Sequence, residues 1–316
     1  MSTSTVTADS LQKRGPSTGF EPETVPYGVV LGCPRSGTTF LSRVLNTIPE
    51  FESITGTLLP VAIPHVVHRD LPNDVYDALT VGFERALDAY IHSGRYHNRA
   101  MAVKKWLDVP SGVGDLYRAL TGPRPLPTRL IYKEPFLSMA PQFVLDALPD
   151  ARIVYIYRDG RDVANSLVRT YDVLTDERLT HLRGSEMRLG RPYDHRYVPW
   201  WVEPGDENAF MDATPYGRAI WMWTFVMETC DSVFNRPDVK ATENVLFVRY
   251  ESFVSTPREV GHDIVEHLGG QPTRATKRFL SNAHTSSIGK HESRESREVD
   301  QAEAIAADML KQYGYL

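Results

Sequence analysis

The fold is decided by the stretch Gly32-Cys33-Pro34-Arg35-Ser36-Gly37-Thr38-Thr39, which follows the apolar run Tyr27–Leu31. Its two glycines stand five positions apart and precede a pair of hydroxyl residues, which is the frame of a phosphate-binding P-loop. This frame predicts a strand that turns tightly into a helix, with the backbone N–H groups of the turn surrounding an anion. Thr38 stands where a nucleotide triphosphatase has lysine. We therefore expect an anion other than the β/γ-phosphate pair of ATP.

Apolar patterning along the rest of the chain predicts an α/β fold. Buried parallel strands are expected at Tyr27–Leu31, Arg129–Tyr132, Ile153–Tyr157 and Val245–Val248. Helical spacing follows the loop up to Pro49, and it recurs over residues 162–171, 217–234, 257–268, 272–282 and 300–312. Strands alternating with helices indicate a three-layer, P-loop-like fold, in which a central parallel sheet is flanked by helices.

Two segments depart from this pattern. Residues 1–25 are rich in Ser, Thr, Glu and Pro, so we expect a mobile N-terminal tail before a single domain over 26–316. Residues 172–215 are rich in polar and aromatic side chains and show no sustained period, which predicts an irregular substrate lid. The aromatic residues of that stretch could wall the acceptor site or pack on the core: Tyr193, Tyr197, Trp200, Trp201 and Phe210.

Composition excludes several classes of protein. The net charge of −5 disfavours a nucleic-acid binder, and no apolar stretch approaches the roughly 20 residues of a membrane span. Two cysteines cannot form a disulfide framework, and the N-terminus lacks the basic-then-apolar order of a signal peptide. We expect a cytoplasmic protein of open oligomeric state, in which Cys33 is a small packing residue.

A second candidate anion site follows the strand predicted at Ile153–Tyr157. Arg158 comes directly after that strand, and Ser166 lies eight residues later on the next helix. A guanidinium at the C-terminal end of a parallel strand faces the ligand crevice of an α/β fold and suits bidentate binding of a phosphate. The alternative is a surface ion pair between Arg158 and Asp159 or Asp162.

Together, the loop Pro34–Thr39 and the pair Arg158 and Ser166 resemble the two phosphosulfate-binding signatures of the sulfotransferases. The resemblance covers residues 27 to 295, and it is greatest to the branch of tyrosylprotein and bacterial small-molecule sulfotransferases. It implies that 3′-phosphoadenosine-5′-phosphosulfate (PAPS) is the sulfuryl donor. Its 5′-phosphosulfate would lie on Pro34, Arg35, Ser36, Gly37, Thr38 and Thr39, and its 3′-phosphate on Arg158 and Ser166.

Three shorter matches extend the resemblance. Tyr132-Lys133-Glu134-Pro135-Phe136 is similar to the element that supplies an active-site lysine in the tyrosylprotein enzymes. Arg249-Tyr250-Glu251 resembles the element whose tyrosine lies near the adenine. The loop that closes over the nucleotide would be Ser286, Ser287, Ile288, Gly289 and Lys290.

The expected reaction moves a sulfuryl group in line to a hydroxyl of a small-molecule, lipid or glycoside acceptor, and releases 3′,5′-ADP. Arg35 and Lys133 are candidates to stabilise the bridging oxygen as its bond to sulfur breaks. A sulfuryl group in transfer carries less negative charge than a phosphoryl group, so we expect no metal requirement. Positioning of the acceptor would supply much of the remaining rate.

The sequence does not identify the general base. The tyrosylprotein branch has a glutamate about twenty residues beyond the loop arginine, whereas this chain has Thr55-Gly56 there. The candidates are His65, His68 and Glu134; a histidine near its ordinary pKa suits removal of a hydroxyl proton. The missing glutamate favours a small hydroxylated acceptor over protein tyrosine. Two other functions remain as alternatives: an ATP- and Mg²⁺-dependent phosphotransferase, and a catalytically silent nucleotide-binding relative.

Overall fold

The computed structural model describes residues 26–55, 59–92, 127–171, 174–181 and 190–316, together with the single positions 103, 106, 117 and 120. The tail predicted at residues 1–25 lies outside these ranges. Within the described part of the chain, no helix is both long enough and apolar enough to cross a membrane.

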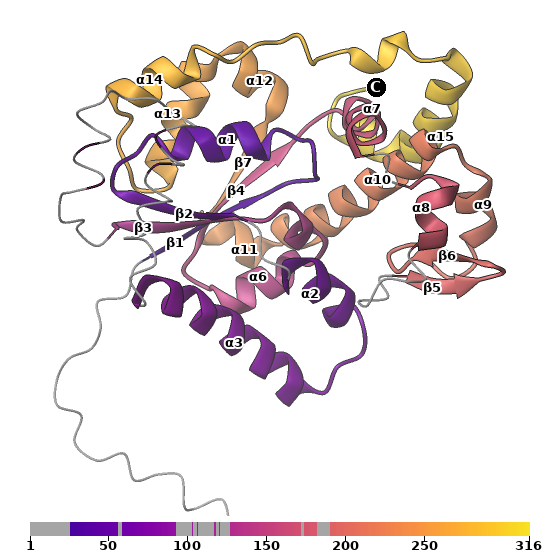
Figure 1. The fold of residues 1–316 in the computed structure, drawn as a ribbon, viewed down its shortest axis with the longest axis horizontal. Coiled ribbons are helices and arrows are strands. Elements are labelled where there is room, and N and C mark those ends of the chain that lie inside the picture. Colours follow the sequence, from indigo (N-terminus) through magenta and orange to yellow (C-terminus); the bar gives the residue numbers. More distant parts are fainter. Residues whose placement is uncertain are drawn as a thin grey trace, which may run out of the picture.

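A parallel sheet of five strands forms the centre of the fold (Figure 1). The strand order is β2-β3-β1-β4-β7, and every neighbouring pair is parallel. The strands span Tyr27–Leu31 (β1), Phe51–Thr55 (β2), Arg129–Lys133 (β3), Arg152–Tyr157 (β4) and Val245–Arg249 (β7). The four strands predicted from sequence are confirmed as β1, β3, β4 and β7. β2 was missed because its sequence, FESIT, interrupts its apolar residues with Glu52 and Ser53, which are nevertheless buried.

Helices cover both faces of the sheet, which confirms the predicted three-layer arrangement. One face carries α1 (Thr38–Leu45), α12 (Tyr250–Ser255), α13 (Pro257–His267) and α14 (Arg274–Leu280) (Figure 1). The other carries α3 (Asn73–His92), α6 (Pro141–Ala147), α7 (Gly160–Tyr171), α10 (Pro215–Phe234), α11 (Pro237–Ala241) and α15 (Ser296–Gln312). The helices predicted over 162–171, 217–234, 257–268, 272–282 and 300–312 correspond to α7, α10, α13, α14 and α15.

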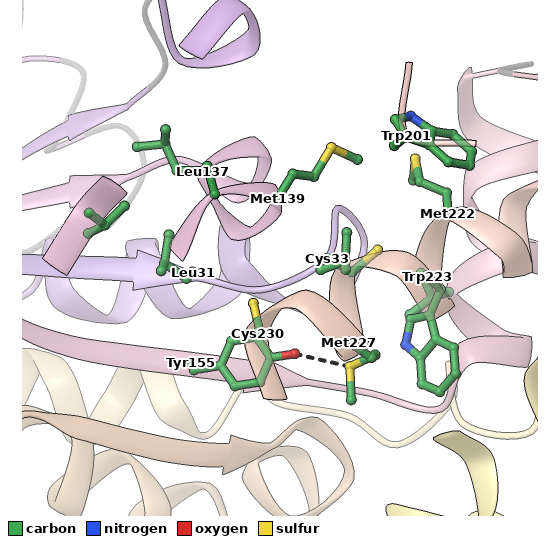
Figure 2. Packing of buried hydrophobic residues seen from close by; sticks show 14 of the residues in the cluster. Leu31, Cys33, Leu137, Met139, Tyr155, Trp201, Met222, Trp223, Met227 and Cys230 are labelled. Carbon is green, nitrogen blue, oxygen red and sulfur yellow. Dashed lines mark hydrogen bonds between the residues drawn. The ribbon is translucent and has the colours of Figure 1, made fainter. Parts of the chain in front are cut away.

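The two cores follow from the alternation of side chains along each strand. Val29 and Leu31 of β1 belong to the core under α10, whereas Val30 between them belongs to the core under α1. Figure 2 shows Leu31, Cys33, Tyr155 and Cys230 in the first of these cores. Both cysteines are buried, and burial raises the pKa of each thiol. This agrees with the prediction that Cys33 packs within the protein.

The prediction of an irregular segment over residues 172–215 is wrong for its described part. That part contains α8 (Asp176–His181), a hairpin of β5 (Gly190–Tyr193) and β6 (Arg196–Pro199), and α9 (Glu207–Asp212). Each of these elements has four to six residues, which is too short to display a hydrophobic period. The buried Arg218 of α10 holds two of these elements, because it donates to the carbonyl of Leu174, just before α8 (2.9 Å), and to the carbonyl of Phe210 in α9 (3.0 Å).

The sheet topology determines where a ligand can be held. The strands β1 and β4 are neighbours, but α1 follows β1 onto one face and α7 follows β4 onto the other. In open α/β sheets, ligands bind beyond the C-terminal ends of the strands at such a point of divergence. The turns after β1 and β4 contain both anion-binding motifs predicted from the sequence.

Candidate functional site

The loop after β1 has the backbone of an anion-binding turn. The amide of Ser36 donates to the Cys33 carbonyl at 3.0 Å, and Arg35 has a φ of 78°, which is strained for a residue with a side chain. Gly37 precedes α1 with a φ of 98°, and no side chain caps the helix there. The first amides of an α-helix have no acceptor within the helix, so those of Thr38 and Thr39 can bind an external anion.

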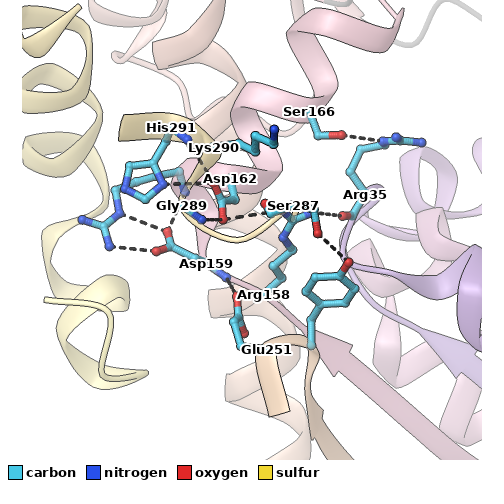
Figure 3. Close-up of polar contacts among 12 residues, drawn as sticks. Arg35, Arg158, Asp159, Asp162, Ser166, Glu251, Ser287, Gly289, Lys290 and His291 are labelled. Atoms are coloured by element: carbon cyan, nitrogen blue, oxygen red, sulfur yellow. Dashed lines mark hydrogen bonds and ion pairs between the residues drawn. The ribbon is translucent and has the colours of Figure 1, made fainter. Parts of the chain in front are cut away.

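The side chain of Arg35 joins this loop to α7. Its Nε donates to Ser166 Oγ at 2.9 Å, and its Nη1 donates to Tyr171 Oη at 3.4 Å. The guanidinium also lies over the Tyr171 ring, 5.3 Å from the ring centroid. The two motifs that the sequence separates by 131 positions therefore meet at this arginine (Figure 3).

Arg158 lies behind the loop and is 5% exposed. Its Nη1 donates to the Arg35 carbonyl at 3.2 Å, its Nη2 donates to the Ser287 carbonyl, and its guanidinium lies 4.6 Å from the centroid of the Tyr250 ring. Arg158 Nη2 is 3.5 Å from Asp162 Oδ2. The alternative of an ion pair between these residues therefore holds in part, although the pair is buried and does not lie on the surface. Asp159 pairs with Arg161 instead.

The segment 286–291, from the C-terminal third of the chain, lies against Arg158 and Tyr250 (Figure 3). The hydroxyls of Ser287 and Tyr250 are 2.8 Å apart, and Ser286 Oγ lies 2.8 Å from Nδ1 of His284. The side chains of Ile288 and Lys290 are exposed. Tyr250 also packs against Gly37, where a Cβ would lie 2.4 Å from its ring. Four of the predicted elements thus meet: the loop, Arg158, Tyr250 and the 286–290 segment.

Lys133 and Glu134 occupy the end of β3 beside the loop. Lys133 is in register with Val30 of β1 and is half-buried; burial lowers the pKa of its ammonium, although the charge of Glu134 opposes this. The Glu134 carboxylate accepts from the Phe136 amide at 3.1 Å and caps the 3₁₀ turn η3 (Pro135–Met139). Burial raises the pKa of Glu134, while the Phe136 amide and Lys133 oppose the shift.

The two candidate histidines lie on α2 (Leu59–Val67) and just after it, and they make different contacts. His68 Nε2 lies 2.6 Å from the Met139 carbonyl, whereas His65 Nε2 lies 2.8 Å from the Arg69 guanidinium. The His68 ring is 4.7 Å from that of Trp200, centroid to centroid. The turn η3 links His68 to the loop, because Ser138, next to Met139, accepts from the Gly32 amide at 2.7 Å.

Comparison with known proteins identifies the chain. The model of the sulfotransferase family matches residues 26–212, which is more than half of the chain. The chain belongs to the sulfotransferase family. It is therefore a transferase that moves sulfuryl groups. The match covers the loop, Lys133, Arg158, Ser166 and both histidines.

Three solved structures resemble this sulfotransferase along most of its length. The sulfotransferase domain of the olefin synthase of Synechococcus PCC 7002 is 18% identical, and the match covers 91% of this chain and 98% of that one with a TM-score of 0.43. Sulfotransferase STF9 from Mycobacterium avium is 17% identical, with 92% of this chain and 77% of that one covered and a TM-score of 0.45. A sulfotransferase from Alicyclobacillus acidocaldarius is 19% identical, with 89% of this chain and 96% of that one covered and a TM-score of 0.41. A search of curated proteins finds no match to the sequence.

Several residues that support the candidate site were not predicted as site residues from the sequence. Trp223 of α10 donates from Nε1 to the Arg158 carbonyl at 3.0 Å, and its ring packs against Gly160, where a Cβ would lie 2.4 Å away. Asp162 and His291 connect α7 to the 286–291 segment. Gly160, two residues after Arg158, was the available sequence signal for the close approach of Trp223. Gly289 and His291, the partners of Asp162 in the 286–291 segment, lie too far along the chain for any local pattern to indicate them.

Thr55-Gly56 stands where the tyrosylprotein sulfotransferases have a glutamate. Thr55 is the last residue of β2, and Gly56 lies outside the described residues. Of the aromatic residues predicted to wall the acceptor or pack on the core, Trp201 and Phe210 are buried in the core under α10. Trp200 is half-buried and packs on His65, His68 and Phe225. Packing on the core is therefore confirmed for Trp201 and Phe210, whereas a wall of the acceptor site stays a prediction.

Proposed function

We propose that this sulfotransferase transfers the sulfuryl group of PAPS to a hydroxyl of a small-molecule, lipid or glycoside acceptor and releases 3′,5′-ADP. The observation that carries the proposal is the junction of the two motifs, where Arg35 Nε donates to Ser166 Oγ and Arg158 Nη1 donates to the Arg35 carbonyl. One ligand with two separate anionic groups would engage both. We further propose that the protein works in the cytoplasm, since its two cysteines are buried and unpaired.

Two buried polar atoms support binding of such a donor. Ser36 Oγ and Arg158 Nε have no hydrogen-bond partner among the described residues. Buried polar groups are nearly always paired, so unpaired ones beside an anion-binding turn fit a polyanionic ligand. We assign the 5′-phosphosulfate to the amides and side chains of Pro34–Thr39, and the 3′-phosphate to Arg158 and Ser166. Tyr250 and the segment Ser286–Lys290 would hold the nucleoside.

In the proposed reaction the acceptor oxygen attacks sulfur, and the bond from sulfur to the bridging oxygen breaks with its electron pair left on that oxygen. Arg35 and Lys133 neutralise the charge that develops there, since one follows β1 and the other ends the neighbouring strand β3. The burial that lowers the pKa of Lys133 also strengthens its interaction with an anion.

We propose that His68 is the base that takes the acceptor's proton. The Met139 carbonyl can only accept, so His68 Nε2 carries a proton and Nδ1 is the basic nitrogen. Arg69 can only donate, so His65 Nε2 accepts and its proton lies on Nδ1, which is buried without a partner among the described residues. The Glu134 carboxylate already caps η3. His68 is thus the candidate with a suitable nitrogen.

The acceptor side is aromatic. His68, Trp200 and Phe225 pack against one another with ring centroids 4.7–5.7 Å apart. This arrangement supports an acceptor that presents an apolar or ring-shaped body beside its hydroxyl. Because the chain also has Thr55-Gly56 where the tyrosylprotein branch has a glutamate, we favour a small hydroxylated molecule over a tyrosine within a protein.

Titration calorimetry with 3′,5′-ADP tests the proposed donor. We expect the wild-type protein to bind it and Arg158→Ala to bind at least tenfold more weakly, with ATP and Mg²⁺ binding poorly to both. Equal binding by the two proteins, or a preference for ATP, would count against PAPS. A screen for transfer of labelled sulfate from PAPS to hydroxylated acceptors then separates an enzyme from a silent nucleotide-binding protein.

A further inference from the structure

Asp162 of α7 is a buried carboxylate near the proposed donor site. Its side chain is 1% exposed and accepts three hydrogen bonds (Figure 3). Oδ2 accepts from the Gly289 amide at 2.8 Å, and Oδ1 accepts from the amide and Nδ1 of His291, each at 3.0 Å. All these donors belong to the turn at the end of the 286–291 segment. One carboxylate therefore fixes that turn to the start of α7.

The same carboxylate lies beside the proposed phosphate-binding arginine. Asp162 Oδ2 is 3.5 Å from Arg158 Nη2, and that Nη2 also donates to the carbonyl of Ser287. Arg158 and Asp162 are one helical turn apart, at the β4–α7 junction. Arg158 and the segment Ser287–His291 are thus held as one unit through Asp162.

The turn itself requires this support. Gly289 has a φ of 72° and begins the 3₁₀ turn η5 (Lys290–Ser293) without a capping side chain. The neighbouring side chains Ser286, Ile288 and Lys290 are exposed, so few apolar contacts hold the segment. His291, at 7% exposure, is the buried residue that anchors it, and Asp162 accepts from both its amide and its ring.

We propose that Asp162, with His291 as its partner, is a positioning residue for the sulfuryl donor, because it holds the 286–291 segment in the place where that segment closes on the nucleotide. This inference rests on the proposed function. Neither residue needs to touch the donor. Asp162 acts through Arg158 and through the backbone of Ser287–Gly289, which places those groups before the donor arrives and reduces the entropy lost on binding.

The proposal predicts a result of opposite sign to simple electrostatics. Replacing Asp162 with alanine removes a negative charge 3.5 Å from Arg158, which on charge alone would strengthen binding of an anion. If Asp162 positions the segment, Asp162→Ala instead weakens binding of 3′,5′-ADP by about tenfold or more. It also raises KM for the donor while leaving KM for the acceptor unchanged.

The test is titration calorimetry of 3′,5′-ADP against the wild-type protein, Asp162→Ala, Asp162→Asn and His291→Ala. Glu207→Gln is the matched control, because Glu207 likewise pairs with a guanidinium (Arg191, 2.8 Å) and accepts from a backbone amide (Gly205, 2.7 Å) but lies on α9. We expect the three variants at positions 162 and 291 to bind more weakly and the control to bind as the wild type does. Unchanged or tighter binding by Asp162→Ala would overturn the proposal.

Hydrogen exchange separates the possible failures. The amides of Gly289 and His291 should exchange faster in Asp162→Ala, whereas the interior amides of α7 stay protected. If α7 also loses protection, the variant is misfolded, and His291→Ala, which leaves the carboxylate and both backbone donors in place, becomes the deciding measurement. If the wild type does not bind 3′,5′-ADP, the proposed donor is wrong. If it binds but the Asp162 and His291 variants match it, the positioning role is wrong.

Discussion

Arg35 Nε donates a hydrogen bond to Ser166 Oγ at 2.9 Å, across 131 positions of sequence. One residue comes from the turn after β1 and the other from α7, which follows β4. Because β1 and β4 are neighbours, both motifs open at the same edge of the sheet. The contact joins the loop proposed to bind the 5′-phosphosulfate to Ser166, which is proposed to bind the 3′-phosphate. One donor molecule could therefore contact both motifs.

The guanidinium of Arg158 makes a first quantitative prediction. Arg158→Lys keeps the positive charge but loses the planar fork that donates to two carbonyls and presents Nε. Hydrogen bonds to a charged group are worth about 1.5–3 kcal/mol, so we expect roughly 10- to 100-fold weaker binding of 3′,5′-ADP. Calorimetry measures this. Binding equal to the wild type would show that charge alone suffices and that the fork has no role.

Lys133 should set the alkaline limit of activity. Burial lowers its pKa from the ordinary value of 10.5, with Glu134 opposing, so the ammonium loses its proton as the pH rises through a range that begins below 10.5. We expect kcat to fall with rising pH in that range. Lys133→Arg should move the limb to higher pH, because arginine stays charged, and Lys133→Met should lower kcat at every pH. If kcat fell over the same pH range in Lys133→Arg, the fall would be due to the titration of another group.

The histidines should differ in their effect on kcat. We expect His68→Ala to lower kcat by about 10²- to 10⁴-fold with little change in donor affinity, because a general base contributes about that much. His65→Ala should have a smaller effect, since its Nε2 already accepts from Arg69. Single-turnover rates for both variants decide the matter. A larger loss in His65→Ala would reverse the assignment.

Gly37 should tolerate no side chain, whereas Gly82 should. A Cβ at Gly37 would lie 2.4 Å from the Tyr250 ring, at a φ of 98°, so Gly37→Ala should destabilise the fold by about 1–3 kcal/mol and weaken donor binding. Gly82 lies within α3 with nothing within 4 Å of its Cβ position, and Gly82→Ala should stabilise by about 0.5–1 kcal/mol. Urea denaturation of both variants measures the difference. Equal effects would contradict the loop geometry.

Asp162 should contribute to stability at neutral pH and lose that contribution in acid. Burial by itself raises its pKa, but the hydrogen bonds from His291, the charge of Arg158 and the Gly289 amide outweigh burial, so the pKa lies below its usual value. The folded state therefore holds the charged form more tightly than the unfolded state, and this advantage disappears as the pH falls below about 4. Urea midpoints of wild type and Asp162→Asn should converge there. Parallel profiles down to pH 3 would contradict this linkage.

Local sequence determined the parts of this protein that depend on a few adjacent residues. The glycine spacing of the loop, the apolar runs of β1, β3, β4 and β7 and the helical period of α7 and α10 each indicate one backbone conformation, because dihedral preference and side-chain alternation act over short distances. The resemblance of the loop and Arg158 to the sulfotransferases also needed no structure. β2 and the short elements between 174 and 212 escaped because they are too short or too polar to show a period.

Tertiary structure alone decided which of these residues meet. The bond from Arg35 to Ser166, the support of Arg158 by Trp223 and the attachment of the 286–291 turn to Asp162 join positions 65 to 131 residues apart. Such contacts depend on the strand order and on which face each helix packs, and these follow from burying both faces of the sheet at once. The same packing gave His65 and His68 different partners, although the sequence presents them as an equivalent pair three residues apart.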